Sequence, residues 1–150
     1  MQPKGEFGVN ALIALGSNAP SVWGDAATTV QKAISKVEKS VGQTPIVSRF
    51  YTTPAFPEGA GPDFVNAAIR LRTNLGAQKL LYVLHLIEAD AGRERIVRWG
   101  QRTLDLDLIA LDDVVLPDPK THQYWRDLPL EIQAKSAPEQ LILPHPRVQD

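Results

Sequence analysis

The segment Leu104–Leu108 alternates apolar and acidic residues, reading Leu-Asp-Leu-Asp-Leu, with the period of two that a β-strand imposes. Successive side chains of a strand point to opposite faces, so Asp105 and Asp107 share one face, with Cα atoms roughly 7 Å apart. Neighbouring anions repel each other, and a purely structural strand seldom carries them without a compensating cation. The pattern therefore predicts a strand whose acidic face is either solvated at a sheet edge or part of a binding site.

A group of arginines precedes this strand within a run of ten residues. Its members are Arg93, Arg95, Arg98 and Arg102. The formal net charge of the chain is −1, so this cationic group is a local feature. Mg²⁺ prefers carboxylate, water and phosphate oxygens, and arginine is well suited to binding phosphate. The arginines could instead be surface partners of a solvated edge strand, but their concentration favours a site for a metal ion and a polyphosphate. Trp99 in the same polar loop favours a lid that closes over an aromatic, phosphorylated ligand.

The bulk properties predict a single domain over residues 1–150. The chain is 43% hydrophobic and has no cysteine, which excludes disulfides and thiolate chemistry and indicates a reducing cytoplasm. The first residues contain no apolar signal core, and no apolar stretch approaches the length that spans a membrane. The near-neutral charge weighs against a nucleic-acid binder. We therefore expect a soluble, cytoplasmic protein with small-molecule substrates and with neither nucleic-acid nor membrane partners.

Strand and helix periodicities follow one another in the order β-α-β-β-α-β. Strands are expected at Val9–Leu15, Ile46–Thr52, Asp63–Arg72 and Leu104–Ile109, and helices at about Ser21–Val41 and Ala77–Ala91. This order predicts an α+β, ferredoxin-like core, an antiparallel sheet with helices packed on one side. From residue 112 onward prolines are frequent and periodicity is weak. We expect an extended, loop-rich C-terminal segment there, with one or two short helices within residues 121–137.

Several other residues allow more than one interpretation. Gly16-Ser17-Asn18 follows the first strand and is typical of a turn, and neither a Walker sequence nor a GxGxxG motif is present. His85 and Glu88 lie three residues apart on one helix face, which favours a surface pair over a ligand site. His122 is expected in an exposed loop. His145 stands between two prolines, which suits either a ligand contact or an ordinary loop.

The stretch RWGQRTLDLDLI resembles the signature of the 6-hydroxymethyl-7,8-dihydropterin pyrophosphokinase family. The stretches ALGSN, FYTTPAF, DFVNAAI and LPHPR occur in the order that this family shows, so the resemblance covers about residues 9–149. It implies a ferredoxin-like fold and an enzyme of folate biosynthesis. The implied reaction transfers the terminal diphosphate of ATP to the hydroxymethyl group of the pterin and releases AMP.

The resemblance also implies roles for individual residues. Two Mg²⁺ ions that bridge the ATP phosphates would be held by Asp105 and Asp107. The pterin would be bound by Thr53, Pro54, Phe56, Phe64, Asn66 and Trp99. The catalytic residues would be Arg93, Arg95, Arg98, Arg102 and Asp107. The nucleotide would be contacted by His85, Glu88, Arg93, Arg98, Arg102 and His145.

Members of the family continue past the LPHPR segment with an arginine that contacts ATP and an aromatic residue that stacks on the pterin. This chain ends at Asp150, so we expect the C-terminal part of the family domain to be missing. One alternative is a non-catalytic pterin- or nucleotide-binding module of the same fold. Another is a ferredoxin-like nucleic-acid or regulatory module, which the net charge disfavours. A dihydropteroate synthase is the expected partner, either fused to the protein or acting after it.

Overall fold

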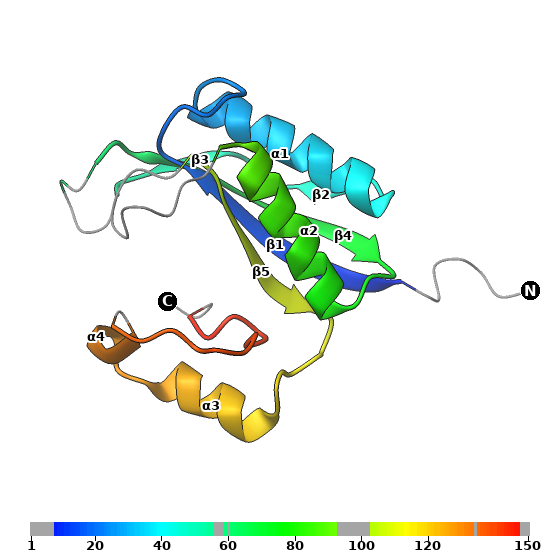
Figure 1. The fold of residues 1–150 in the computed structure, drawn as a ribbon, viewed down its shortest axis with the longest axis vertical. Coiled ribbons are helices and arrows are strands. Elements are labelled where there is room, and N and C mark those ends of the chain that lie inside the picture. Colours follow the sequence, from blue (N-terminus) through cyan, green and yellow to red (C-terminus); the bar gives the residue numbers. More distant parts are fainter. Residues whose placement is uncertain (1–7, 56–58, 60, 93–102, 134, 148–150) are drawn as a thin grey trace, which may run out of the picture.

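The computed structural model describes residues 8–55, 59, 61–92, 103–133 and 135–147. Its elements follow one another along the chain as β1 (Val9–Ser17), α1 (Ala26–Val41), β2 (Ile46–Val47), β3 (Tyr51–Thr53), β4 (Phe64–Thr73), α2 (Ala77–Asp90), β5 (Asp105–Leu111), α3 (Pro119–Asp127) and α4 (Leu130–Gln133) (Figure 1). None of the helices in these ranges is both long and apolar enough to cross a membrane.

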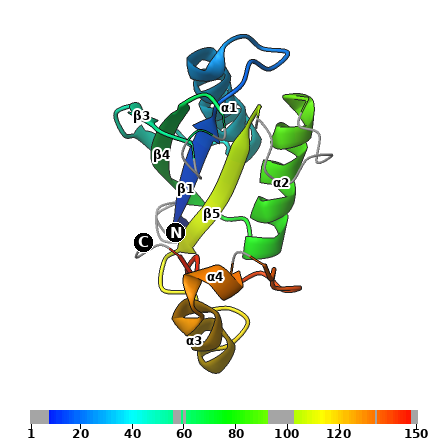
Figure 2. The same ribbon diagram turned by 90° about the vertical axis from the view of Figure 1, so that its left-hand side faces the viewer.

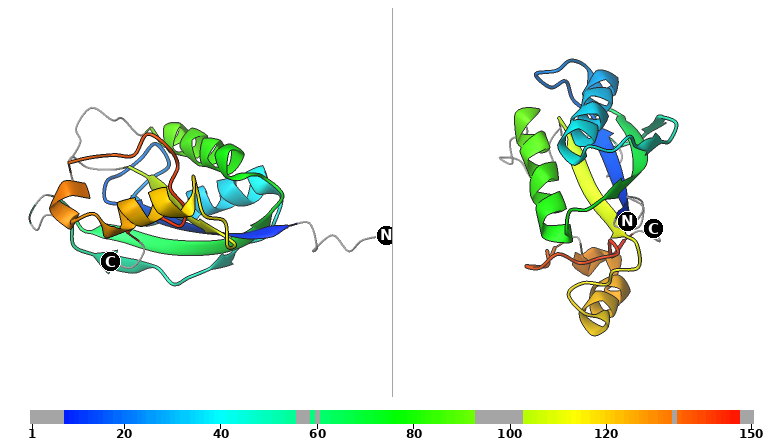
Figure 3. Two further views of the ribbon diagram at one scale, coloured as in Figure 1. Left: turned by 90° about the horizontal axis from the view of Figure 1, so that it is seen from below. Right: turned by 90° about the vertical axis from the view of Figure 1, so that its right-hand side faces the viewer.

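The strands form one antiparallel sheet in the order β2-β4-β1-β5, and β3 also pairs with β4. Helices α1 and α2 lie on the same side of this sheet (Figure 3). The strands β2 and β3 together occupy the place of the second strand of the βαββαβ unit. The ferredoxin-like α+β prediction is therefore confirmed.

The core lies between the sheet and these two helices. Ile13 and Ile69 from the sheet and Val30 and Leu84 from the helices are almost completely buried. In β4, which corresponds to the third expected strand, Ala67, Ile69 and Leu71 are buried on the helix side at alternate positions. The alternate positions of β1, β4 and β5 consequently face away from the helices.

Helix α1 begins later than expected, at Ala26 instead of about Ser21. Ser21 and Gly24 bond to each other through their backbones at 2.8 and 3.2 Å, which closes a tight turn before the helix. Asp25 then caps the helix by accepting a hydrogen bond from the Thr28 amide at 2.8 Å. Gly42 ends the helix with a φ of 80°, the left-handed conformation expected at that position.

The single strand expected over residues 46–52 is interrupted between β2 and β3. The Ser48 amide donates to the Ala68 carbonyl, and the Ser48 hydroxyl accepts the Ala68 amide, both at 2.9 Å. A side-chain oxygen thus takes the place of a backbone carbonyl in the ladder. This local competition, typical of serine, ends regular pairing.

The C-terminal segment lies at the C-terminal end of β5, and α3 and α4 are below that strand in both views (Figures 1 and 2). Leu116 and Leu143 form an antiparallel bridge, and the His145 amide donates to the Ile109 carbonyl at 2.7 Å. Leu143 is fully buried and belongs to the core. The expectation of one or two short helices in this segment is confirmed by α3, which begins two residues earlier than expected, and by α4. The segment as a whole completes one side of the core.

Candidate active site

A row of paired residues crosses the sheet face that points away from α1 and α2. Gly16 of β1 pairs with Asn66 of β4 on one side and with Asp105 of β5 on the other. Directly paired residues share a sheet face, so the Asn66 and Asp105 side chains flank Gly16. Their Cα atoms are about 10 Å apart, because neighbouring strands are spaced by about 4.8 Å.

A side chain at Gly16 would displace the Asn66 side chain from its observed position. A Cβ atom at this position would lie 2.7 Å from Asn66 Oδ1 and 3.6 Å from the Phe64 ring. Asn66 Nδ2 in turn donates to Thr53 Oγ1 at 2.5 Å. Sequence reasoning interpreted Gly16 as a turn residue and missed this role, although a glycine inside a strand often marks close packing.

The structure therefore brings together three of the residues expected to bind the pterin, Thr53, Phe64 and Asn66. Pro54 directly follows β3 and is exposed beside them in the chain. Phe56 and Trp99 lie outside the described residues. The amide of Asn66 and the ring of Phe64 provide hydrogen-bonding and stacking groups on one surface.

Asp105 and Asp107 lie on the same side of β5, as the alternation predicted. Asp105 is partly exposed and Asp107 is exposed. The residues paired with them in β1 are Gly16 and Ala14, whose small size leaves space beside the carboxylates. Oxygen donors of this kind fit a hard divalent cation. Among the described residues, no group of three or more histidine, aspartate or glutamate side chains converges on a possible metal site. A metal ion at this pair would take its other ligands from water or from a phosphate.

His145 lies at the outer side of β5, on the peptide that bonds to Ile109. Burial is the main cause that lowers the pKa of its imidazole, the positive charge of Arg147 adds to this effect, and the negative charge of Asp105 opposes it. The Arg147 amide donates to His145 Nδ1 at 3.3 Å. The neutral ring consequently carries its proton on Nε2, which can donate to an anionic oxygen.

Glu88 corrects one prediction. It was expected to form a surface pair with His85, but its side chain is only 3% exposed. Glu88 accepts a hydrogen bond from the Leu106 amide at 2.8 Å, whereas His85 is exposed on α2. Glu88 follows Leu84 by four residues and therefore lies on the buried face of the helix. The nucleotide contacts of both residues stay predictions.

His122 corrects another prediction, because it lies in helix α3 and not in an exposed loop. It is half-buried, and its Nε2 atom is 3.0 Å from the Pro144 carbonyl oxygen. The arginines expected in the catalytic loop, Arg93, Arg95, Arg98 and Arg102, lie outside the described residues.

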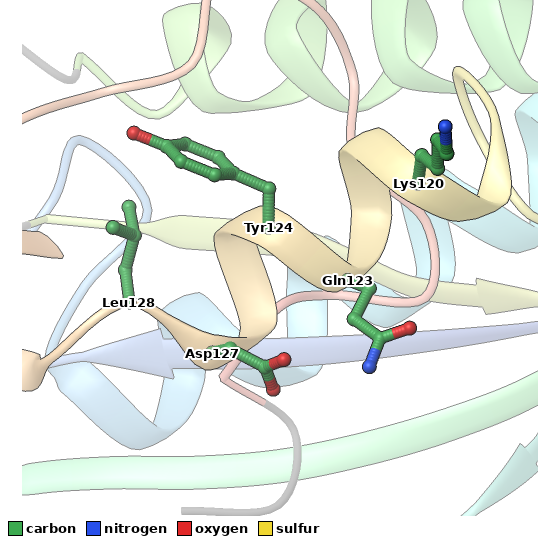
Figure 4. Close-up of a pocket in the computed structure, with 5 residues that line it drawn as sticks. All are labelled: Lys120, Gln123, Tyr124, Asp127 and Leu128. Atoms are coloured by element: carbon green, nitrogen blue, oxygen red, sulfur yellow. The ribbon is translucent and has the colours of Figure 1, made fainter.

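A cavity of about 440 Å³ lies against helix α3 (Figure 4). It is lined by Lys120, Gln123, Tyr124, Asp127 and Leu128. These lining residues do not include a predicted site residue. The candidate site is therefore defined by the carboxylates of Asp105 and Asp107 and by the surface that Asn66, Phe64 and Thr53 form, which we call the Asn66 surface, and not by this cavity.

Comparison with known proteins shows the family of this chain. The family model for 7,8-dihydro-6-hydroxymethylpterin-pyrophosphokinase matches residues 12–150. The chain belongs to this family. It is 36% identical over 112 residues to the 2-amino-4-hydroxy-6-hydroxymethyldihydropteridine pyrophosphokinase of Haemophilus influenzae, which covers 75% of this chain and 68% of that protein. The protein of the same name from Bacillus subtilis is 33% identical over 140 residues, covering 92% of this chain and 69% of the relative.

A plant relative is named as a bifunctional protein. The mitochondrial folate synthesis bifunctional protein of Pisum sativum is 38% identical over 99 residues. That match covers 65% of this chain and 18% of the plant protein. The pyrophosphokinase-like part is thus one portion of a longer polypeptide in that relative.

Proposed function

We propose that this protein is a pyrophosphokinase of folate biosynthesis. It transfers the diphosphate of ATP to the hydroxymethyl group of 6-hydroxymethyl-7,8-dihydropterin and releases AMP. Membership of the family and the names of its relatives support this activity. The observation that carries it for this chain is the row Asn66–Gly16–Asp105, which brings a candidate pterin surface next to a pair of carboxylates.

The pterin is proposed to bind at Thr53, Pro54 and the Asn66 surface. The Asn66 side chain offers both donors and an acceptor, which suits the hydrogen-bonding edge of a pterin ring. Its hydrogen bond to Thr53 holds the amide in one orientation before the ligand arrives. Phe64 offers a face for stacking, and Phe56 and Trp99 are proposed to complete the pocket.

Asp105 and Asp107 are proposed to hold two Mg²⁺ ions. When bound, these ions neutralise negative charge on the phosphates of ATP. Asp107 would lie nearest the pterin hydroxymethyl group. His145 would donate from Nε2 to a phosphate oxygen, and the exposed His85 is proposed to approach the nucleotide, whereas the buried Glu88 supports β5 through the Leu106 amide.

The reaction requires an in-line attack of the pterin hydroxyl oxygen on the β-phosphorus. A bond forms between these atoms as the hydroxyl gives up its proton to solvent, and the bond from the β-phosphorus to the oxygen that bridges it to the α-phosphorus breaks, so that AMP leaves with that oxygen. Catalysis of this kind depends mainly on positioning and on charge stabilisation. Arg93, Arg95, Arg98 and Arg102 are proposed to supply positive charge around the phosphates.

We also propose that the protein acts in the cytoplasm, because a chain without cysteine fits a reducing compartment.

The pea relative's name supports a link with a second folate enzyme. We propose that a dihydropteroate synthase uses the product, either as a fused domain or as a separate protein.

The direct test measures AMP formation from ATP and Mg²⁺ with and without the pterin alcohol. Pterin-dependent release of AMP, together with the pterin diphosphate in equal amount, is expected. Calorimetric binding of the pterin without any AMP would instead indicate a non-catalytic binding module. Strongly salt-dependent RNA binding without pterin binding would contradict the proposed function altogether.

A further inference from the structure

The peptide between Pro144 and His145 is hydrogen-bonded at both of its polar atoms. Its carbonyl oxygen is 3.0 Å from His122 Nε2, and its amide donates to the Ile109 carbonyl at 2.7 Å. A peptide unit is planar, so contacts at these two atoms fix the orientation of the whole plane. The N and Cα atoms of His145 belong to that plane, so α3 on one side and β5 on the other fix the backbone position from which the His145 side chain extends.

The donor from α3 sits on a well-anchored part of the helix. Asp118 caps α3 by accepting hydrogen bonds from the Thr121 amide and hydroxyl at 2.8 and 2.9 Å. The His122 amide donates to the Asp118 carbonyl at 3.0 Å. Just before the helix, Leu116 is paired with Leu143, close in sequence to the peptide that His122 contacts. The backbone of α3 at His122 is consequently held in a fixed position relative to Pro144.

Helical geometry separates His122 from the cavity on the same helix. Residues of an α-helix are rotated by about 100° from one to the next, so Lys120, Gln123, Tyr124 and Asp127 share one side and His122 lies on the opposite side. Figure 4 shows the cavity-lining side chains extending from α3. The contact of His122 with Pro144 is therefore on the side of α3 that faces away from the cavity. A substitution on the cavity side of the same helix can serve as a control for a substitution of His122.

We propose that His122 is a positioning residue for the phosphate site. It donates from Nε2 to the Pro144 carbonyl and thereby holds the backbone of His145 against Ile109 of β5, in the position from which the Nε2 proton of His145 reaches the phosphate. The inference rests on the proposed function, because it assigns the polyphosphate of ATP as the group that His145 contacts. It gives α3, which the family motifs leave without a role, a place in nucleotide binding.

The kinetic test compares three variants in the full chain. His122→Phe keeps an aromatic ring but removes the donor, whereas His122→Gln keeps an N–H group the same number of bonds from the backbone. Gln123→Ala changes the opposite side of α3. His122→Phe is expected to raise the KM for ATP about three- to tenfold, the effect of losing one hydrogen bond. The KM for the pterin alcohol and kcat are expected to stay within about twofold. His122→Gln is expected to restore the KM for ATP, and Gln123→Ala to leave it unchanged.

A second readout does not depend on turnover. In ¹H–¹⁵N spectra of the histidine rings, His122→Phe is expected to shift the His145 ring signals, and His122→Gln to return them toward their original positions. If no variant and not even the unchanged chain forms AMP, the proposed function fails while these spectra still decide the contact. Unmoved His145 signals in folded His122→Phe would overturn the inference. An equal rise in the KM for ATP and the KM for the pterin alcohol in His122→Phe, with no recovery in His122→Gln, would overturn it as well. Such a result indicates a general structural role for His122.

Discussion

The Glu88 carboxylate accepts a hydrogen bond from the Leu106 amide at 2.8 Å. Leu106 lies between Asp105 and Asp107 on β5, the last strand in the described order of the sheet. Backbone groups on the outer side of such a strand need partners other than a neighbouring strand. A buried side chain from α2 supplies one, so the helix layer directly supports the strand that presents the two carboxylates. Glu88 thus contributes to the geometry of the site from the opposite side of the sheet.

Replacing Glu88 by alanine is expected to destabilise the fold by about 1–3 kcal/mol, the usual cost of leaving a buried backbone donor without a partner. Glu88→Gln keeps an acceptor oxygen at the same distance from the backbone, so its free energy of unfolding is expected to decrease less than that of Glu88→Ala. Urea unfolding followed by circular dichroism measures both changes.

His85→Ala is the matched control, because His85 is exposed on the same helix. Its free energy of unfolding is expected to change by less than about 0.5 kcal/mol. Equal stabilities for Glu88→Ala and His85→Ala would contradict the structural role assigned to the buried carboxylate.

The fold could be predicted from the sequence because local and long-range patterns agree. The strand at Phe64–Thr73 and the helix at Ala77–Asp90 end within about two residues of the predicted bounds, and the periodic apolar positions that face the core are buried, among them Ile69, Leu71, Leu80 and Leu84. The break at Ser48 was missed because it depends on a hydrogen bond to Ala68, twenty residues away in the chain. A side chain that replaces a backbone acceptor leaves no trace in hydrophobic periodicity.

The candidate site was predictable in part. Alternation alone places Asp105 and Asp107 on one face. It does not give the register that puts Asn66 across Gly16 from Asp105, because register depends on pairing between distant strands. The burial of Glu88 had a readable signal, its position four residues after Leu84. His122 had none, since its contact is with a carbonyl twenty-two residues further along the chain.

Gly16→Ala is expected to weaken pterin binding. The new methyl group would lie 2.7 Å from Asn66 Oδ1, so the Asn66 side chain would have to move from its hydrogen bond to Thr53. Loss of one oriented hydrogen-bonding group corresponds to about three- to tenfold in KM for the pterin alcohol. The KM for ATP is expected to change less, and steady-state kinetics at saturating levels of the other substrate separate the two values.

Gly76→Ala provides the comparison for this substitution. A Cβ atom at Gly76 has nothing within 4 Å among the described residues, and its φ of −70° suits any amino acid. Binding of the pterin alcohol should be unchanged in this variant. If Gly16→Ala binds the pterin as well as Gly76→Ala does, the row Asn66–Gly16–Asp105 is not part of the substrate surface.

Asp105→Asn and Asp107→Asn are each expected to lower kcat/KM by about 10²- to 10³-fold, the scale for removing an electrostatic contact that stabilises the transition state. Each amide is nearly the same size as the carboxylate, so the fold should be retained. Kinetics across a range of Mg²⁺ concentrations test the metal assignment, because loss of a ligand charge raises the Mg²⁺ concentration needed for activity.

Asp113→Asn, an exposed position shortly after β5, serves as the control for the removal of one negative charge. Its activity is expected to match that of the unchanged chain. Survival of turnover within a few-fold in either strand variant would show that the carboxylates do not hold the metal ions.

The free energy of unfolding is expected to decrease as the pH falls below about 6.5, the ordinary pKa of a histidine. Burial and Arg147 lower the pKa of His145 in the folded chain, so the unfolded chain binds a proton at a higher pH than the folded chain does. Stability then rises with pH in this window, is complete above pH 6.5, and is lost as the pH falls toward the lowered pKa. Urea unfolding between pH 7.5 and pH 5, spaced at about half a unit, measures the slope.

His145→Gln should flatten this slope, since the variant has no imidazole at position 145 to titrate.

A second decline in stability, at lower pH, has a separate origin. Hydrogen bonds from Thr28 and Thr121 lower the pKa values of the helix-capping residues Asp25 and Asp118, so their stabilising effect is present above about pH 3.8 and is lost below it. The two windows are distinct, and His145→Gln should change the upper one alone. An identical decline between pH 6.5 and pH 5 in His145→Gln would assign the upper window to another group and leave His145 without the partly buried, neutral state that its phosphate-donor role requires.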